Sequence, residues 1–193
     1  MGVDINTFQP LTGAGCESGE ACMKASRKVS AQQWGDWVRE AYPGYSGPYP
    51  RVIVWQGMKD QYVDDDNAFE IVKQWTNVNG IDQSADNNSS KLKAGNTKHN
   101  YYEYTNSAGK ALVAMVEIPE MKHGIAIDPG TGEDQGGEAF SAVMGMVKFA
   151  FDVDLYSSYY TAKWWGLLDW QNNPDEPIRS EERRVGKECR SRW

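Results

Sequence analysis

The chain has 193 residues, of which 40% are hydrophobic and 12% aromatic, so it can bury the core of one folded domain. Its formal net charge of −7 disfavours nucleic acid as a partner, because an acidic surface repels phosphates; a neutral or sugar-like substrate fits better. The sequence contains no run of about 18 apolar residues, so we expect no transmembrane helix and no membrane partner.

The first thirty residues are rich in Gly, Ser and Thr and predict a loop. Cys16 and Cys22 flank a small polar segment, which favours a disulfide in a secreted protein; two unpaired thiols are the alternative. Overlapping glycosylation sequons at Asn87 and Asn88 also favour an extracellular protein. The N-terminus lacks the basic start and apolar stretch of a secretion signal.

The next segments predict a helix, a strand and a second helix. Ser30 is expected to cap a short helix ending at Ala41, and residues 51–55 form an apolar run typical of a central parallel strand buried on both faces. Phe69, Val72 and Trp75 then follow at helical spacing. Three aspartates precede this helix, where carboxylates favour the helix dipole; a calcium site is the alternative: Asp64, Asp65 and Asp66.

The second half of the chain predicts two strands and a final helix. After a polar loop, a Tyr-rich strand is expected over 99–105 and an apolar strand over 110–118, joined by a turn. A loop carrying His123 follows, and an apolar helix is expected over 138–151. This order of elements indicates an α/β fold with parallel strands and flanking helices.

Asp60 and His123 are the candidate catalytic residues. Asp60 follows the strand on a Gly-containing turn, where functional residues of open α/β sheets gather. His123 comes 63 residues later on a loop punctuated by Gly and Pro. The order acid then histidine is that of an α/β-hydrolase triad, in which the nucleophile comes first. The alternatives are a turn-forming aspartate, a solvated loop histidine and, for His99, a structural or surface role.

No residue of the chain fits the nucleophile of such a triad. A nucleophilic serine would lie in Gly-x-Ser-x-Gly between a strand and a helix. The nearest match, at Ser46, lacks the second glycine spacing, lies in a Pro-rich loop and precedes a strand. Cys16 and Cys22 also lack this context. The sequence therefore predicts an acid and a base without their nucleophile.

Several short segments resemble the poly(3-hydroxybutyrate) depolymerase-like esterases, which include the acetylxylan and feruloyl esterases of carbohydrate esterase family 1. The resemblance runs in the same order from about residue 20 to residue 168, and these segments carry it: 31–36, 41–45, 51–63, 74–77, His123 with 128–130, and 159–167. It implies the C-terminal part of an α/β-hydrolase fold, Asp60 as triad acid and His123 as general base. It also implies a secreted parent protein whose nucleophile and oxyanion hole lie upstream of Met1.

The resemblance further implies a substrate class: acetyl or feruloyl esters of a plant polysaccharide such as xylan, or a polyhydroxyalkanoate polyester. No cofactor and no metal are expected. Trp55, Trp164 and Trp165 are candidate substrate-binding residues, with burial in the core as the alternative for each. We expect this chain alone to be inactive, and we expect the apolar edge at 52–54 to limit its solubility.

Residues 179–193 differ sharply in composition from the rest, with six Lys or Arg, three Glu and no periodicity. They resemble the conceptual translation of a sequencing-library adapter; the alternative is a basic tail that binds an acidic partner. We therefore expect one esterase-like domain over residues 1–178 and an artefactual tail over 179–193.

Two other functions fit parts of the sequence. A non-enzymatic carbohydrate-binding protein could stack sugars on its tryptophans, although the predicted helices argue against the usual all-β module: Trp34, Trp37, Trp55, Trp164, Trp165 and Trp170. A complete enzyme could use Asp60 and His123 without a covalent nucleophile, with a metal. Only two histidines and no His-Glu cluster make a zinc site a poor fit.

Overall fold

The computed structural model describes residues 19–24, 29–87, 91–137 and 149–168. The chain forms two compact units, Met1–Tyr160 and Thr161–Trp193, and each is described by itself. All strands that the structure describes lie in the first unit, together with helices α1 (Gly19–Met23), α2 (Ala31–Ala41) and α3 (Asp66–Asn79). The boundary falls inside helix α4 (Ser157–Trp165), while the predicted domain end at residue 178 lies outside the described residues.

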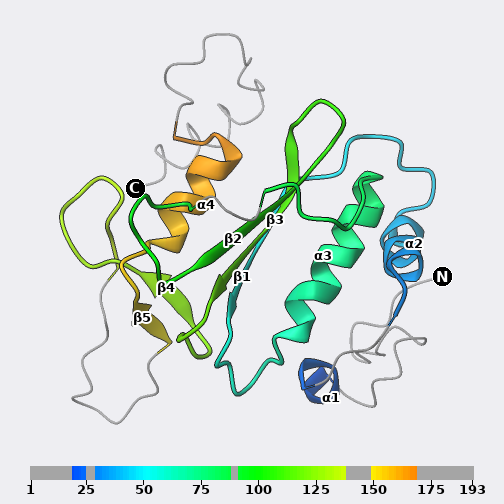
Figure 1. The fold of residues 1–193 in the computed structure, drawn as a ribbon. Coiled ribbons are helices and arrows are strands. Elements are labelled where there is room, and N and C mark those ends of the chain that lie inside the picture. Colours follow the sequence, from blue (N-terminus) through cyan, green and yellow to red (C-terminus); the bar gives the residue numbers. More distant parts are fainter. Residues whose placement is uncertain (1–18, 25–28, 88–90, 138–148, 169–193) are drawn as a thin grey trace, which may run out of the picture. The chain divides into compact units, whose positions relative to one another are not determined.

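A three-stranded sheet is the centre of the first unit (Figure 1). Strand β3 (Ala111–Ile118) lies between β1 (Val52–Gly57), which is parallel to it, and β2 (Asn100–Thr105), which is antiparallel. Within the described residues β1 is an edge strand, which agrees with the apolar edge expected at 52–54 but not with the central position that the apolar run over 51–55 favours. The strand buried on both faces is β3, whose residues from Val113 to Ile118 are all buried.

Helix α3 packs against one face of the sheet and lies in the connection from β1 to β2 (Figure 1). Its buried residues include Ala68 and Val72, which face a core cluster from three strands: Val54, Tyr104, Val113 and Met115. Trp75 is partly buried against this cluster, whereas Phe69 is 40% exposed, so Phe69 does not share the core face. The predicted helix and the two parallel strands are therefore confirmed, with a longer helix than the apolar spacing indicated.

Helix α2 packs on the outer side of α3. As predicted, Ser30 caps α2, its hydroxyl accepting a hydrogen bond from the Gln33 N–H at 3.1 Å. Trp34 donates its indole N–H to Glu70 of α3, and Lys73 pairs with the same carboxylate group at 2.7 Å. The bond from Trp34 to Glu70 joins α2 to α3, and α3 in turn packs against the sheet.

Three short elements differ from the sequence-based expectations. Helix α1 lies within the segment predicted as loop, and β4 (Ile125–Ile127) pairs in parallel with β5 (Ala150–Asp152). The helix predicted over 138–151 lies outside the described residues up to 148. Its last two residues were predicted wrongly, because Ala150 and Phe151 are strand. Pairing with β4, a partner distant in sequence, overrides their apolar helical pattern there.

No helix among the described residues has the length and apolar character needed to cross a membrane.

Candidate functional site

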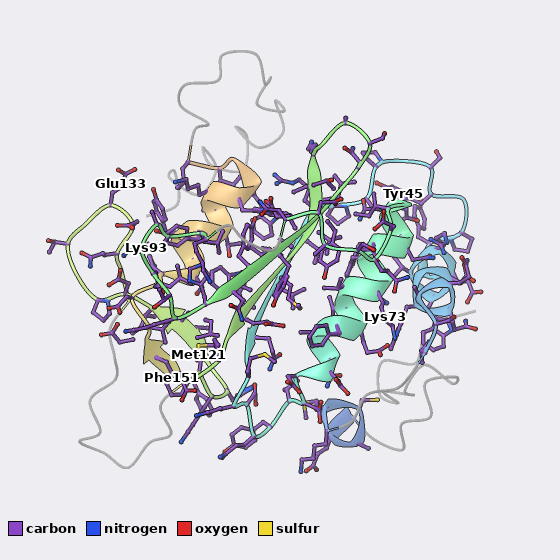
Figure 2. The ribbon with its side chains drawn as sticks, viewed as in Figure 1. Tyr45, Lys73, Lys93, Met121, Glu133 and Phe151 are labelled. Carbon is purple, nitrogen blue, oxygen red and sulfur yellow. The ribbon has the colours of Figure 1, made fainter. Side chains whose placement is uncertain are left out.

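Backbone hydrogen bonds join the turn after β1 to the segment after β3. The N–H of Met58 donates to the Ile118 carbonyl and the N–H of Lys59 to the Met121 carbonyl, both at 3.0 Å. A Cβ at Gly57 would lie 2.5 Å from the Met121 carbonyl oxygen, so only glycine permits this approach. Because β1 and β3 are parallel, their carboxyl ends meet, and these bonds bring two distant loops together. Figure 2 labels Met121 in this region.

The two predicted catalytic residues lie side by side at this junction. The Oδ2 atom of Asp60 is 2.8 Å from Nδ1 of His123. The Asp60 side chain is buried, at 8% exposed, whereas that of His123 is 42% exposed. The second carboxylate oxygen accepts the backbone N–H groups of Tyr62 at 2.8 Å and Val63 at 2.9 Å. Asp60 is thus fixed by its own turn and presents one oxygen to an accessible imidazole.

These contacts determine the charge of Asp60. Burial raises the pKa of its carboxyl, but the hydrogen bonds from Val63, His123 and Tyr62 outweigh burial, so the pKa lies below its usual value. Asp60 is therefore a carboxylate at neutral pH and can only accept hydrogen bonds. A neutral His123 must then carry its proton on Nδ1, which leaves Nε2 as a base.

Two aromatic rings flank the imidazole. The ring centroid of Tyr62 lies 5.3 Å from that of His123, and the ring centroid of Phe149 lies 5.7 Å from it. Both contacts are edge-to-face, and the Phe149 ring is nearly perpendicular to the imidazole at 89°. Tyr62 was in the predicted acid turn without an assigned role, and Phe149 was assigned to a helix. In the sequence, the position of Tyr62 two residues after Asp60 is the one signal for its contact with His123.

The arrangement is an acid–base pair of the kind that activates a hydroxyl nucleophile. Among the residues that the structure describes, His123 makes no hydrogen bond to a serine hydroxyl. Ser46 lies in the loop between α2 and β1 and is exposed. The catalytic roles of Asp60 and His123 remain predictions at this point.

The other predicted site residues lie on β1, on α4 and near the N-terminus. Trp55 is a partly buried residue of β1, paired with Val116. Trp164 and Trp165 lie on α4 in the second unit, and Trp165 is 47% exposed. Their substrate-binding roles stay predictions. Cys22 is disulfide-bonded, but Cys16 lies outside the described residues, so the predicted pairing stays a prediction.

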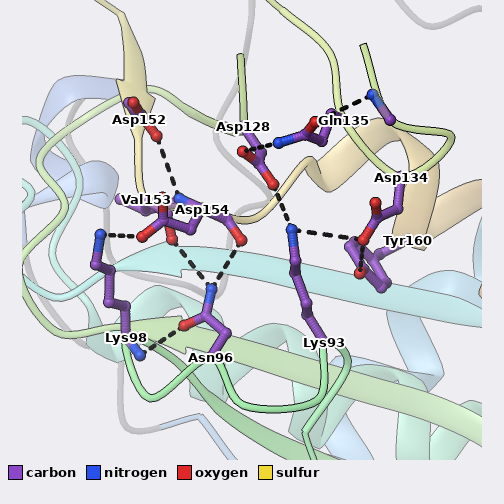
Figure 3. Close-up of polar contacts among 11 residues, drawn as sticks. Lys93, Asn96, Lys98, Asp128, Asp134, Gln135, Asp152, Val153, Asp154 and Tyr160 are labelled. Carbon is purple, nitrogen blue, oxygen red and sulfur yellow. Dashed lines mark hydrogen bonds and ion pairs between the residues drawn. The ribbon is translucent and has the colours of Figure 1, made fainter. Parts of the chain in front are cut away.

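Within the described residues, two groups of carboxylates lie close enough to share a cation: Asp64, Asp65 and Asp66, and Asp128, Asp152 and Asp154. The first group starts α3 as predicted, with the Asp64 carboxylate accepting the Asp66 N–H at 3.0 Å. In the second group, Lys93 pairs with Asp128 and Lys98 with Asp154 (Figure 3). Two of the three carboxylates in the second group, Asp128 and Asp154, are thus each paired with a lysine.

The buried Asp128 is the centre of a polar network that the sequence did not predict (Figure 3). Besides Lys93, it accepts a hydrogen bond from the Gln135 amide at 3.0 Å. Lys93 also lies 3.5 Å from Asp134, which accepts a hydrogen bond from the hydroxyl of the buried Tyr160 at 2.8 Å. These contacts fix the loop that follows β4, the strand that comes next after His123 in the chain.

His99 is structural, one of the two roles expected for it. It is 1% exposed, and its Nε2 accepts the Leu92 N–H at 3.1 Å, while its Nδ1 is buried without a hydrogen-bond partner among the described residues. Burial, with the nearby Lys91 charge, lowers the pKa of His99 to about 4. The ring is therefore neutral under ordinary conditions and is not a candidate base.

The chain is similar in sequence to proteins named as esterases and to one named as a depolymerase. The poly(3-hydroxyalkanoate) depolymerase C of Paucimonas lemoignei is 36% identical over 147 residues, covering 76% of this chain and 33% of that protein. The acetylxylan esterase of Coprinopsis cinerea is 41% identical over 122 residues, covering 59% of this chain and 31% of that protein. No family model matches the chain.

Feruloyl esterase B of Talaromyces stipitatus is 34% identical over 98 residues, covering 49% of this chain and 27% of that protein. A solved acetyl xylan esterase from Aspergillus awamori has a TM-score of 0.40 at 22% identity, covering 49% of this chain and 32% of that chain. The chain spans about a third of the length of the first two curated relatives. The resemblance is confirmed: over about three quarters of its length the chain is a relative of the poly(3-hydroxybutyrate) depolymerase-like esterases.

Proposed function

We propose that Asp60 and His123 are the acid and the general base of a serine carboxylic ester hydrolase. The observation that carries the proposal is the 2.8 Å contact between a buried carboxylate and an accessible imidazole. The relatives named as esterases and as a depolymerase all cleave ester bonds, which is the chemistry that such a pair serves. The fold proposed for the parent protein is the α/β-hydrolase fold, and its location is extracellular.

In the proposed reaction, Asp60 holds the proton of His123 on Nδ1, and Nε2 accepts the proton of a serine hydroxyl. The serine oxygen attacks the ester carbonyl, and backbone N–H groups stabilise the oxyanion. The imidazolium is stabilised by Asp60 and gives its proton to the departing alcohol. Water then attacks the acyl-enzyme by the same route and releases the acid, which regenerates the serine.

The nucleophilic serine is proposed to lie in residues that these 193 do not include. Two observations support this: the chain spans a third of its relatives, and among the described residues no serine hydroxyl bonds to His123. The substrates proposed are acetylated or feruloylated xylan and polyhydroxyalkanoate. Removing the nucleophile of a triad costs about 10⁶-fold in turnover, so the chain alone should show no hydrolysis.

The experiment begins by extending the source transcript in both directions from the codons for residues 51–63. The expected result is an upstream Gly-x-Ser-x-Gly and a product that hydrolyses 4-nitrophenyl acetate with an acyl-enzyme burst. Asp60→Asn should then lower turnover by about 10⁴-fold and His123→Ala by about 10⁶-fold. Lys59→Ala is the matched control, since Lys59 lies in the same turn and pairs with the exposed Glu120. Full activity in His123→Ala would refute the proposal.

A further inference from the structure

The loop that carries the candidate base is anchored on both sides by backbone hydrogen bonds. Two residues before His123, the Met121 carbonyl accepts the Lys59 N–H at 3.0 Å. Two residues after it, the Ile125 N–H donates to the Phe149 carbonyl at 2.8 Å. The first anchor comes from the turn after β1, and the second comes from the residue directly before β5. The backbone of His123 is therefore fixed by two segments that lie far apart in the sequence.

The imidazole ring is fixed less completely than this backbone. In the described part of the chain its hydrogen bond is to Asp60, at Nδ1, and its side chain is 42% exposed. One hydrogen bond restrains the distance between two atoms, but it lets the ring tilt and turn about that contact. A general base must nevertheless lie within hydrogen-bond reach of the proton that it removes. The orientation of the ring therefore depends on a further contact.

Phe149 makes such a contact. Its ring centroid lies 5.7 Å from that of His123 and the two planes meet at 89°, the edge-to-face geometry that aromatic pairs favour. The ring projects from a backbone that is already bonded to the His123 loop, and a Cβ at Gly124 would lie 2.5 Å from the Phe149 carbonyl oxygen. Because the Phe149 side chain is 49% exposed, burial in the core does not explain its position.

We propose that Phe149 is a positioning residue of the acid–base pair, whose ring fixes the orientation in which His123 meets Asp60. The inference rests on the proposed function, because this orientation matters to the reaction only if His123 acts as the base. A misplacement of about 1 Å in a catalytic group can cost about 100-fold in rate. Tyr62 also contacts the imidazole, but it belongs to the turn that already supplies Asp60, so Phe149 is the restraint from a second element.

The test is nitrogen-15 NMR of the His123 ring in the 193-residue chain, which gives the ratio of the Nδ1-protonated to the Nε2-protonated neutral imidazole. Phe149→Ala should lower that ratio about two- to tenfold, because a ring that turns freely meets Asp60 for less of the time. Phe149→Tyr keeps an aromatic ring and should retain the original ratio. Phe69→Ala is the matched control, since Phe69 is a phenylalanine of similar exposure, at 40%, on α3.

A second measurement needs no variant. Nuclear Overhauser effects between the ring protons of Phe149 and His123 are expected in the unsubstituted chain, and their absence would overturn the inference. A residue that only stabilised β5 would lower the free energy of unfolding in Phe149→Ala and leave the protonation ratio unchanged, so an unchanged ratio would also overturn it.

The same spectra separate this inference from the proposed function. If the unsubstituted chain carries the Nδ1 proton on His123 and Phe149→Ala leaves the ratio unchanged, only the role of Phe149 fails. If the unsubstituted chain lacks that proton, the acid–base assignment itself fails, and the role of Phe149 fails with it.

Discussion

Asp60 divides its two oxygens between two tasks: Oδ1 accepts the N–H groups of Tyr62 and Val63, and Oδ2 lies 2.8 Å from Nδ1 of His123. The first task fixes the carboxylate in the turn after β1. The second joins that turn to a loop 63 residues away. One side chain therefore serves both local structure and the proposed chemistry, and several predictions depend on it.

The first prediction concerns the stability of the folded chain at low pH. The pKa of Asp60 is lower in the folded chain than in the unfolded chain, so its carboxylate stabilises the fold above the unfolded pKa of about 4. That contribution is lost as the pH falls through the folded pKa. Asp60→Asn should therefore lower the free energy of unfolding at pH 7, and by progressively less as the pH falls below 4. Urea unfolding over this pH range measures this, and an effect that does not shrink with falling pH would contradict the account.

A second prediction concerns Gly57. In Gly57→Ala the new Cβ would lie 2.5 Å from the Met121 carbonyl and 2.6 Å from the Lys122 carbonyl, and both are backbone atoms that cannot rotate away. We expect a loss of about 1–3 kcal/mol in the free energy of unfolding. The Asp60–His123 contact should also be lost, because the two loops must separate.

The control for Gly57→Ala is Gly132→Ala, whose Cβ would meet only the Gln135 side chain, which can move. Urea unfolding and the His123 ring signals of both variants make the comparison. Equal stability of the two variants, with the His123 signals unchanged in both, would show that the close approach at Gly57 is not required.

The third prediction concerns His99, whose pKa of about 4 in the folded chain lies below its unfolded value of 6.5. Protonation therefore favours the unfolded chain, and the stability is complete above pH 6.5 and lost as the pH falls towards 4. This linkage predicts a loss of about 2 kcal/mol between pH 7.5 and pH 5. In His99→Gln, which cannot titrate but can still accept the Leu92 N–H, that loss should disappear from the pH profile.

The profile is measured as urea unfolding free energies between pH 7.5 and pH 5. A slope that survives in His99→Gln would show that another group causes the loss.

The fourth prediction compares two lysine–carboxylate pairs. Lys93 pairs with Asp128, whose side chain is only 6% exposed, so Lys93→Ala leaves a buried carboxylate without its cation. We expect a loss of about 2 kcal/mol in the free energy of unfolding. Lys98→Ala removes a pair in which both side chains are more than half exposed, and its effect should be clearly smaller. Thermal unfolding of both variants tests the order, and the reverse order would contradict the network.

Much of the first unit could be predicted from local sequence. Alternating or continuous apolar residues and a Ser30 cap are local signals, and they gave α2, β1, α3, β2 and β3. The pairing of β4 with β5 could not be predicted, because pairing depends on partners distant in sequence. At Phe151, for example, the apolar neighbours in sequence favour a helix, but parallel pairing with Ala126 places the residue in a strand.

The candidate site, like the fold, was predictable where the signal lies within one segment of the sequence. Asp60 and His123 were suggested by turn position and chain order, which are readable one segment at a time. The rings beside His123 were not, because Phe149 reaches it only through the contact of β4 with β5. The Lys93–Asp128 pair likewise joins two loops 35 residues apart, and nothing in either loop indicates the other.

The most direct test of the account is the protonation state of the His123 ring, measured by nitrogen-15 NMR of the chain at neutral pH. His123→Gln identifies the signals against those of His99. The account predicts a proton on Nδ1 and a bare Nε2 in the neutral imidazole, and loss of that preference in Asp60→Asn. A neutral imidazole protonated on Nε2, or an Nδ1 proton unchanged in Asp60→Asn, would contradict the assignment of Asp60 and His123 as acid and base.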